Sequence, residues 1–271
     1  DEAQLYDHAL NADEVHYLYA HPGETISSDP LTEKYDYWVP YVEQTASGPD
    51  ETWNYVLLRG VESGTTVAVD FDHDGVPDVT RSLNAGDSLM LAGPHNTVAG
   101  AVPGLVAGTR ITSNRPVVAY YRFLAGNYSN YRDGMLWYGL PTSRVIGKDF
   151  RLPFSAGKTA VLGTADDTSV SVDTDNDGLA DQTLTLGYGE TAVLSDLPAG
   201  SHLSSSRNVG AVAMVYGSGY YDNTYAVTLL PSSLWSASYY VPLEHPFNYQ
   251  SPTDLSRVMI VAQHDGTSIN V

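Results

Sequence analysis

Apolar and polar residues alternate with a period of two along much of this chain. The segment 65–69 reads TTVAV and the segment 168–172 reads TSVSV, each with valine at every second position from its third residue. Successive side chains of a β-strand point to opposite faces of a sheet, so this period predicts strands with one buried face. Such segments recur between closely spaced Gly and Pro turns, which is typical of a β-sandwich. We therefore predict an all-β fold.

Short polar motifs mark the ends of these predicted strands. AGD at 85–87 and YGE at 188–190 each carry a glycine that suits a turn. SNRP at 113–116 directly precedes the apolar segment VVAYY at 117–121. A hairpin that joins TTVAV to VTRSL at 79–83 is predicted in the same way.

The chain also repeats itself, which is the signature of tandem structural units. The matching segments, in chain order, are 63–93 with 166–196, 106–128 with 198–221, and 140–154 with 230–244.

These matches divide the chain into an N-terminal segment and three units. We predict an N-terminal segment at 1–34, a first unit at 35–147, a second at 148–236 and an incomplete third at 237–271. Residues 256–271 stand in the third unit where residues 54–69 stand in the first. Half a unit cannot bury its own core, so we expect its strands to need a partner.

Acidic residues concentrate in the segment VDFDHDGVPDVT at 69–80. Carboxylates this close repel one another, so we expect a cation among them. Calcium takes about six to eight oxygen ligands, and acids at loop positions 1, 3, 5 and 9, with a glycine at 6 and a carbonyl at 7, supply most of them. The predicted ligands are Asp70, Asp72, Asp74, Asp78 and the backbone carbonyl of Val76. His73, at position 4, is predicted to point away from the ion.

A second segment, VDTDNDGLADQT at 172–183, repeats this spacing. The predicted ligands are Asp173, Asp175, Asp177, Asp181 and the backbone carbonyl of Leu179. The duplication favours two Ca²⁺ sites, and Mg²⁺ fits less well because it demands a rigid octahedral geometry. The alternative is an acidic, solvated hairpin tip without a metal. Arg81 replaces the glutamate that ends a full EF-hand loop, so the first loop resembles the shortened loops of thrombospondin type 3 and dockerin-type repeats.

Composition narrows the classes of partner. The formal net charge is −19, and eight of the 32 acidic residues lie in the two loops. Nucleic-acid binding needs clustered Lys and Arg, whereas the chain has only Lys34, Lys148 and Lys158 as lysines. There is no cysteine, so neither disulfides nor thiolate metal sites are available. No apolar run approaches the roughly 18 residues of a membrane span.

Several features favour an extracellular, secreted protein. The chain has 20 tyrosines and a glycosylation sequon at Asn127-Tyr128-Ser129. Millimolar calcium outside the cell fills weak sites of the predicted kind. The chain begins DEAQLYDHAL, without a starting methionine or a signal peptide, so we expect a processed product or an excerpt of a larger protein.

Two aromatic clusters, at 127–139 and 216–227, stand at equivalent places in the first two units. Their candidate interface or ligand residues are Tyr128, Tyr131, Trp137, Tyr138, Tyr220, Tyr221 and Tyr225. A sugar-binding or adhesive loop, a subunit interface and an ordinary loop held by its tyrosines all remain open. No HExxH, P-loop or GxSxG motif occurs, so we predict no enzyme.

The order of these motifs resembles the IgGFc-binding-protein N-terminal domain family and its microbial relatives. The motifs that carry the resemblance are LP at 140–141, FRLP at 150–153, TTV at 65–67, LNAGD at 83–87 and ITSNRP at 111–116. They cover roughly 35–271 and keep their order twice, but SSSRNVGAVA at 204–213 lacks the proline. The resemblance implies extracellular β-sandwich repeats in adhesive or structural surface proteins, and it implies no catalytic residues.

The N-terminus resembles a different family. AQLYDHALNADEVHYLYAHPG at 3–23 is similar to the tail of a laminin-G-like, concanavalin-type jelly roll, with a last strand and a short helix. Asn11 and Glu14 are spaced as in a capping box, and Val15 and Leu18 give the helix an apolar face. An isolated amphipathic helix packed on the first sandwich is the alternative.

Two functions are compatible with these features. The first is a structural segment of a secreted, calcium-stabilised cell-surface or filament protein that assembles with neighbouring copies through strand and interface contacts. The second is an extracellular adhesin, a module that binds carbohydrate or glycoprotein through its aromatic loops.

Overall fold

The structure is a computed structural model that describes residues 35–42, 53–93, 99–125, 134–215, 225–236, 262 and 266–268. The described chain folds into strands β1 to β16 and one short 3-10 helix, so the all-β prediction is confirmed. Within these ranges no helix is long and apolar enough to cross a membrane. The predicted N-terminal helix and most of the predicted third unit lie outside the described residues.

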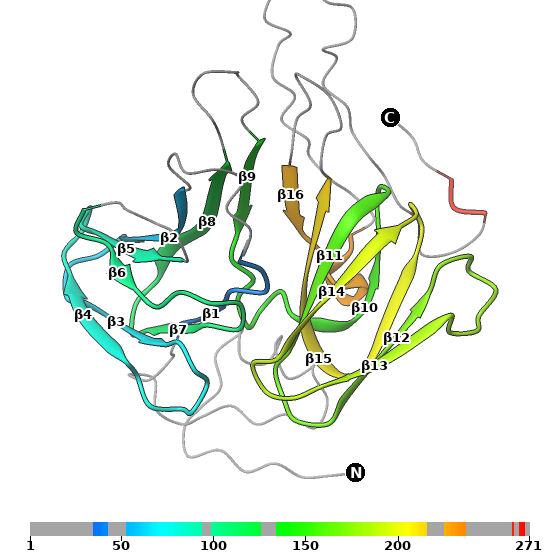
Figure 1. Ribbon diagram of the computed structural model, residues 1–271, viewed down its shortest axis with the longest axis horizontal. Helices are drawn as coiled ribbons and strands as arrows, with labels where there is room; N and C mark the ends of the chain where they lie inside the picture. Colours follow the sequence, from blue (N-terminus) through cyan, green and yellow to red (C-terminus); the bar gives the residue numbers. More distant parts are fainter. Residues whose placement is uncertain are drawn as a thin grey trace, which may run out of the picture.

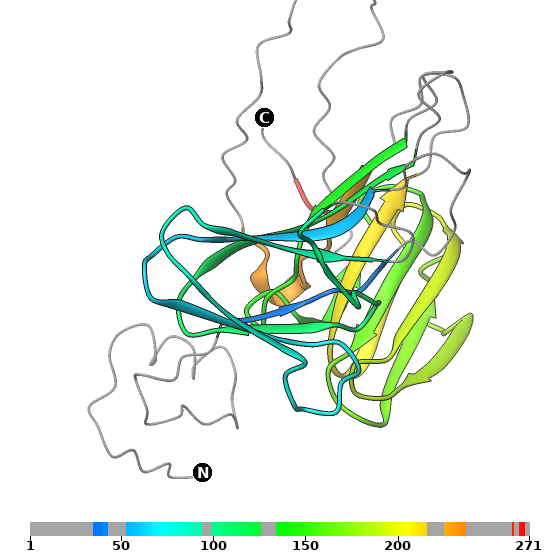
Figure 2. The same cartoon turned by 60° about the vertical axis from the view of Figure 1, so that its left-hand side comes forward.

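Strands β1 to β9 form two sheets (Figure 1). Their bounds are β1 Tyr35–Trp38, β2 Trp53–Gly60, β3 Thr65–Asp70, β4 Val79–Leu83, β5 Ser88–Ala92, β6 Val102–Pro103, β7 Arg110–Ser113, β8 Val117–Ala125 and β9 Gly134–Gly139. The strand orders are β1-β7-β3-β4 and β6-β5-β2-β8-β9. Figure 2 shows these two layers from the side. Val67, Val69 and Ile111 of the first sheet share a fully buried core with Val56 and Leu58 of the second.

Strands β10 to β16 form a single seven-stranded sheet. Their bounds are β10 Gly147–Arg151, β11 Ala156–Gly163, β12 Thr168–Asp173, β13 Gln182–Leu186, β14 Thr191–Leu197, β15 His202–Val215 and β16 Tyr225–Thr228, followed by the 3-10 helix η1 Ser232–Leu234. The first part of β15 pairs with β10 and β12, and its second part pairs with β11 and β16. Val170, Val172 and Leu203 share a buried core with Val161 and Ala213.

One proline explains why β7 and β8 are separate strands whereas β15 is continuous. Residues 114–116, Asn-Arg-Pro, separate β7 from β8. Proline has no N–H to donate to a ladder, so it is disfavoured inside a strand. The corresponding residues in β15 are Ser206, Arg207 and Asn208, which keep their N–H groups. The strand therefore continues from one layer into the other, as strands do at the corner of folded sheets.

The two strand groups pair their strands in the same register. Tyr37 lies opposite Ile111 in β1 and β7, and Phe150 lies opposite Leu203 in β10 and β15. The order β1-β7-β3-β4 thus corresponds to β10-β15-β12-β13, and β5-β2-β8-β9 corresponds to β14-β11-β15-β16.

The two groups are joined by a layer that is buried on both faces. Val161, Ala211 and Ala213 of β11 and β15 point into the second core. Their neighbours Ala160 and Val212 belong to the first core cluster instead. Because adjacent strand residues face opposite sides, this layer separates the two cores and contacts both. The edge strands β9 and β16 also lie next to each other.

Candidate metal centres

The two predicted calcium loops are the tips of two β-hairpins. Val69 pairs with Val79 at the base of the β3–β4 hairpin, and Val172 pairs with Gln182 at the base of the β12–β13 hairpin. Each loop therefore holds the nine residues between these pairs, 70–78 and 173–181. The first aspartate of each loop, Asp70 or Asp173, is also the last residue of the strand that leads into it.

These first aspartates are buried. Asp70 is 6% exposed and Asp173 is 8% exposed. Both carboxylate oxygens of Asp70 accept backbone N–H groups, from His73 at 2.8 Å and Gly75 at 3.0 Å. Asp173 accepts in the same way from Asn176 and Gly178. Buried carboxylates need such partners, and here the partners come from the turn of the loop itself.

The other loop positions repeat the same pattern of contacts. The backbone N–H of position 5 donates to the aspartate at position 3, that of position 7 to position 5, and that of position 2 to position 9. In the first loop these are Asp74 to Asp72, Val76 to Asp74 and Phe71 to Asp78. In the second they are Asp177 to Asp175, Leu179 to Asp177 and Thr174 to Asp181. Each of the four aspartates in a loop therefore accepts at least one backbone N–H of the same loop.

Two residues of each loop adopt left-handed backbone conformations, which turn the amides toward the first aspartate. Position 4 has φ 65° at His73 and 61° at Asn176, and position 6 has φ 84° at Gly75 and 88° at Gly178. Asn and His tolerate this region better than most side chains. Glycine at position 6 has no Cβ to oppose the turn.

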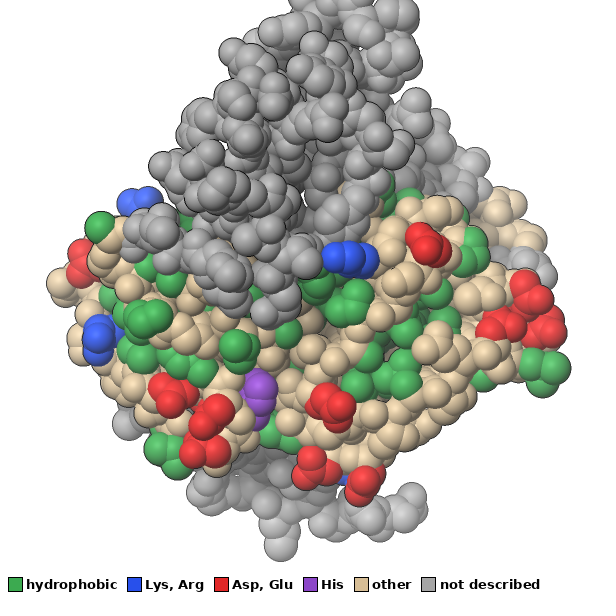
Figure 3. All heavy atoms as spheres, viewed as in Figure 1, with side chains coloured by type: hydrophobic (Ala, Val, Ile, Leu, Met, Phe, Trp, Pro, Cys, Tyr) green, Lys and Arg blue, Asp and Glu red, His purple; other side chains and the backbone are tan. Residues whose placement is uncertain are grey.

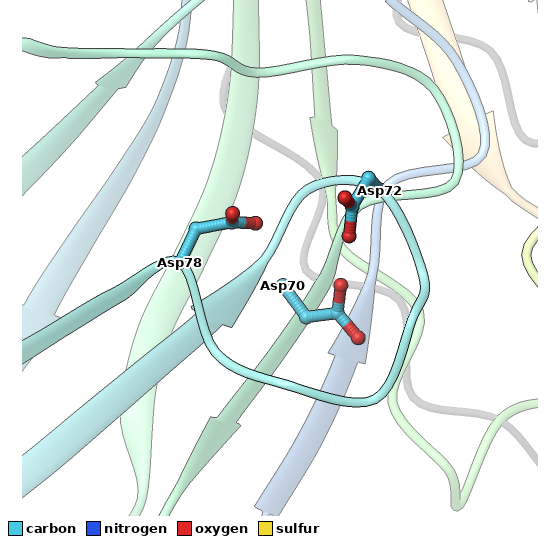
Figure 4. Close-up of side chains that lie close together, drawn as sticks. All are labelled: Asp70, Asp72 and Asp78. Atoms are coloured by element: carbon cyan, nitrogen blue, oxygen red, sulfur yellow. The ribbon is translucent and has the colours of Figure 1, made fainter.

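Each loop brings three carboxylates together. One oxygen each of Asp70, Asp72 and Asp78 lie within 4.8 Å of one another (Figure 4), and so do oxygens of Asp173, Asp175 and Asp177. Calcium–oxygen bonds of about 2.4 Å would place oxygens on opposite sides of one ion roughly 4.8 Å apart. Both triads could therefore hold a metal ion.

Without a cation, the three carboxylates of each triad repel one another. Two unit charges about 4 Å apart cost roughly 1 kcal/mol in water and about 4 kcal/mol at the effective dielectric of a protein surface. Figure 3 shows acidic side chains gathered at the right-hand end, over the β12–β13 loop. Hydrogen bonds from the hydroxyl and backbone N–H of Thr174 lower the pKa of Asp181, so this carboxylate stays charged.

The triads differ from the sequence prediction in two members. Asp74 is not part of the first triad and Asp181 is not part of the second, although both accept hydrogen bonds within their loops. Val76 and Leu179 occupy position 7 with exposed side chains. Their predicted role as carbonyl donors stays a prediction.

The aromatic candidates separate into three sets. Tyr138 is only 3% exposed, and its Oη donates to the carbonyl of Tyr41 at 2.6 Å. Its ring also contacts Tyr121 at a centroid distance of 5.0 Å. Tyr138 is therefore buried in the described chain, and its role as an interface or ligand residue stays a prediction. The backbones of Trp137 and Tyr225 lie in β9 and β16. The remaining candidates, Tyr128, Tyr131, Tyr220 and Tyr221, lie outside the described residues.

A second cluster, which the sequence analysis missed, lies at the junction between the two strand groups. The ring of Tyr188 meets that of Trp38 edge to face at 5.5 Å, and Arg110 Nη1 donates to Tyr188 Oη at 3.0 Å. Arg110 also pairs with Asp36 at 2.9 Å. Burial lowers the pKa of Arg110, but Asp36 and Tyr188 raise it more, so the guanidinium is held charged. The only signal was that Tyr188 stands in a turn where the first group has Ala85.

These features define an all-β protein with two acidic hairpin loops that could each hold a metal ion. Comparison with protein-family models, with curated proteins and with solved structures finds no match to the chain. The resemblances noted from sequence motifs therefore stay predictions.

Proposed function

We propose that residues 35–271 form tandem β-sandwich repeats of a secreted, calcium-stabilised structural protein of the cell surface or an extracellular filament. Each hairpin loop binds one Ca²⁺ in this proposal, and the ion stiffens the hairpin. The protein acts by assembly with neighbouring copies and carries out no catalysis.

The observation that carries the calcium proposal is the agreement between the loops 70–78 and 173–181. Both fold their amides around the same aspartate positions, although only some of their other residues are identical. The buried first aspartate and the left-handed glycine are shared. A solvated, metal-free hairpin tip requires neither a buried carboxylate nor three carboxylates drawn together against their repulsion.

The repeat proposal is supported by contacts outside the loops. Thr65 and Thr168 each donate their hydroxyl to a backbone carbonyl three residues earlier at 2.6 Å. In the turns after β4 and β13, a carboxylate accepts a hydrogen bond from the backbone N–H three residues earlier. Asp87 accepts from Asn84 and Glu190 accepts from Gly187, both at 2.8 Å. These matches favour units near 35–147 and 148–236.

Calcium binding is tested by titrating the chelator-treated chain with Ca²⁺ in a calorimeter. We expect two ions for the native chain, one for Asp72→Asn, one for Asp175→Asn and none for the double variant. Asp167→Asn is the matched control, because this exposed acid outside the loops has a positive φ of 53° that asparagine tolerates. At about 100 times Kd each ion stabilises the fold by roughly 2.7 kcal/mol. Equal unfolding midpoints in Ca²⁺ and EGTA would exclude the calcium role.

The structural role is tested by light scattering and electron microscopy in Ca²⁺ and in EGTA. We expect ordered assemblies in Ca²⁺ that soften or dissociate in EGTA. A monomer in both conditions contradicts the assembly proposal and leaves the calcium proposal standing. The carbohydrate-binding alternative depends on aromatic residues of which Tyr128, Tyr131, Tyr220 and Tyr221 lie outside the described residues, and it stays a prediction.

A further inference from the structure

The junction between the two strand groups is built as a turn held in a socket. The turn is Gly187–Glu190. The socket consists of Asp36, Trp38, His73, Gly108 and Arg110. Tyr188 of the turn contacts Trp38 and Arg110, as described above. Gly189 lies against the ring of His73, and a Cβ at Gly189 or at Gly108 would overlap that ring.

The second strand group carries an equivalent socket, formed by Asp149, Arg151, Asn176, Gly200 and His202. The pair Trp38 and Arg110 in β1 and β7 corresponds in register to Arg151 and His202 in β10 and β15. The backbone N–H of Gly108 donates to Val39 at 2.7 Å, and that of Gly200 donates to Leu152 at 2.8 Å.

The side chains of this second socket follow the same plan. An acid on the outer strand binds a basic group on its neighbour in both sockets, Asp36 with Arg110 at 2.9 Å and Asp149 with His202 at 2.8 Å. The loop residue at position 4 lies against the glycine in both, His73 at Gly108 and Asn176 at Gly200.

The two sockets differ in what fills them. The side chain of Asp36 is 21% exposed, whereas that of Asp149 is 40% exposed. Asn176 is exposed, and Nε of Arg151 is buried without a hydrogen-bond partner. Nη1 of Arg151 donates to Oδ1 of Asn176. A Cβ at Gly108 would meet the carbonyl of Gly189, whereas a Cβ at Gly200 would meet only Asn176, so no turn of the described residues fills the second socket.

The first strand group carries a turn that matches the one held at the junction. Residues 84–87 fold like 187–190: the N–H of Gly86 donates to Gly60 at 2.8 Å, and that of Gly189 donates to Gly163 at 2.9 Å. Gly86 and Gly189 both have positive φ, 85° and 73°. All four residues of the first turn are exposed, whereas Gly189 is buried in the junction.

We propose that the second socket of one copy receives the Asn84–Asp87 turn of the next copy, so that copies join head to tail through the same contact that joins the two strand groups. This inference rests on the self-assembly in the proposed function and names the surface for it. The exposed turn of one copy and the exposed socket of another, both among the described residues, form a heterologous contact, which gives an open chain unless the rotation closes a ring. Ala85 contributes less than Tyr188, so the contact between copies is weaker than the junction.

The absence of cysteine permits a direct test with the full chain. Ala85→Cys and Arg151→Cys are purified separately and mixed under mild oxidation. We expect disulfide-linked dimers in the mixture and far fewer in either variant alone. Ser82→Cys, on an exposed position of β4 near the turn, replaces Ala85→Cys in the control mixture. Equal crosslinking in both mixtures overturns the proposal.

Sedimentation gives an independent measurement of the same contact. We expect Ala85→Tyr to tighten self-association roughly tenfold, through ring contacts and a hydroxyl like those of Tyr188. Ala85→Arg places a second cation at Arg151 and abolishes association, while the exposed position keeps the unfolding midpoint unchanged. If self-association is unaffected by these substitutions, the head-to-tail contact is overturned and the proposed structural role stands. A chain that stays monomeric throughout, including Ala85→Tyr, overturns both.

Discussion

The loops 70–78 and 173–181 have the same internal contacts but different surroundings. Inside, the same backbone amides reach the same aspartates. Outside, His73 of the first loop lies at the junction with the second strand group, whereas Asn176 of the second loop bonds to Arg151 of its own group. The hydrogen bonds inside each loop thus follow from the local spacing of its residues. The contacts of each loop with the rest of the protein depend on its position-4 residue, His73 or Asn176, whose side chain does not face the loop interior.

The buried first aspartates offer the largest test of the shared interior. Asp70→Ala and Asp173→Ala each remove the acceptor of two backbone N–H groups. A hydrogen bond to a charged acceptor contributes about 1.5–3 kcal/mol, and the lower value applies here because water reaches the exposed Gly75, Asn176 and Gly178, so we expect a loss of roughly 3 kcal/mol for either variant. Denaturant unfolding in EGTA measures this loss apart from any metal. Losses that differ by more than about 2 kcal/mol would show that the interiors are not equivalent.

The position-4 residues test the difference outside the loops. His73→Gly and Asn176→Gly make the same change at matched backbones, with φ of 65° and 61°. His73→Gly removes a ring that fills the space between Gly108 and Gly189, so we expect it to cost about 1–2 kcal/mol more than Asn176→Gly. Calorimetry compares the two unfolding transitions.

Equal costs for the two glycine variants would mean that the His73 ring adds nothing to the junction. A further readout separates the junction from the loop itself. The cysteine-free chain accepts labels at Ser82→Cys and Thr183→Cys, two exposed strand positions in the two groups. We expect His73→Gly to broaden the distance distribution between them and Asn176→Gly to leave it unchanged.

A smaller effect is expected for Tyr188→Phe. This change keeps the ring that packs on Trp38 and removes the acceptor of the Arg110 Nη1 hydrogen bond. A hydrogen bond of this kind contributes about 0.5–1.5 kcal/mol. We expect a loss in that range by denaturant unfolding, and a larger loss for Tyr188→Ala, which removes the ring as well. Equal losses for the two variants would contradict the role of the hydroxyl.

The strands and the loops were predictable because both depend on local sequence. Valine at every second position of 65–69 sets a buried face, and the spacing of Asp70, Asp72 and Gly75 sets a turn. The junction was not predictable, because Arg110 and Tyr188 are 78 residues apart and neither belongs to a local pattern. The burial of Tyr138 was not predictable for the same reason, since only the tertiary fold places its ring against Tyr121.

The continuity of β15 is an intermediate case. The sequence showed that the second unit lacks the proline equivalent to Pro116, but not the consequence of that loss. The structure supplies it: one strand of 14 residues serves both layers, and the second group becomes one sheet where the first has two. The missing proline could be seen in the sequence, but its effect on the sheets depended on strand pairing between distant parts of the chain.

The smallest expected effect concerns the acid–base pairs of the two sockets and depends on pH. Burial raises the pKa of Asp149, but hydrogen bonds from His202 and Ser232 and the charges of His202 and Arg151 lower it more, and the net shift is downward. A carboxyl whose pKa is lower in the folded chain stabilises the fold above its unfolded pKa, about 3.9, and loses this contribution as pH falls through the folded pKa.

Asparagine does not titrate, so we expect Asp149→Asn to reduce stability near neutral pH and to show a shallower loss of stability between about pH 5 and pH 2. Because the Asp149 side chain is 40% exposed, solvent screens the pair and the change is modest. Unfolding free energies measured from pH 7 to pH 2 for the native chain and the variant test this, and parallel curves would show that the pair with His202 carries no pH-dependent stability.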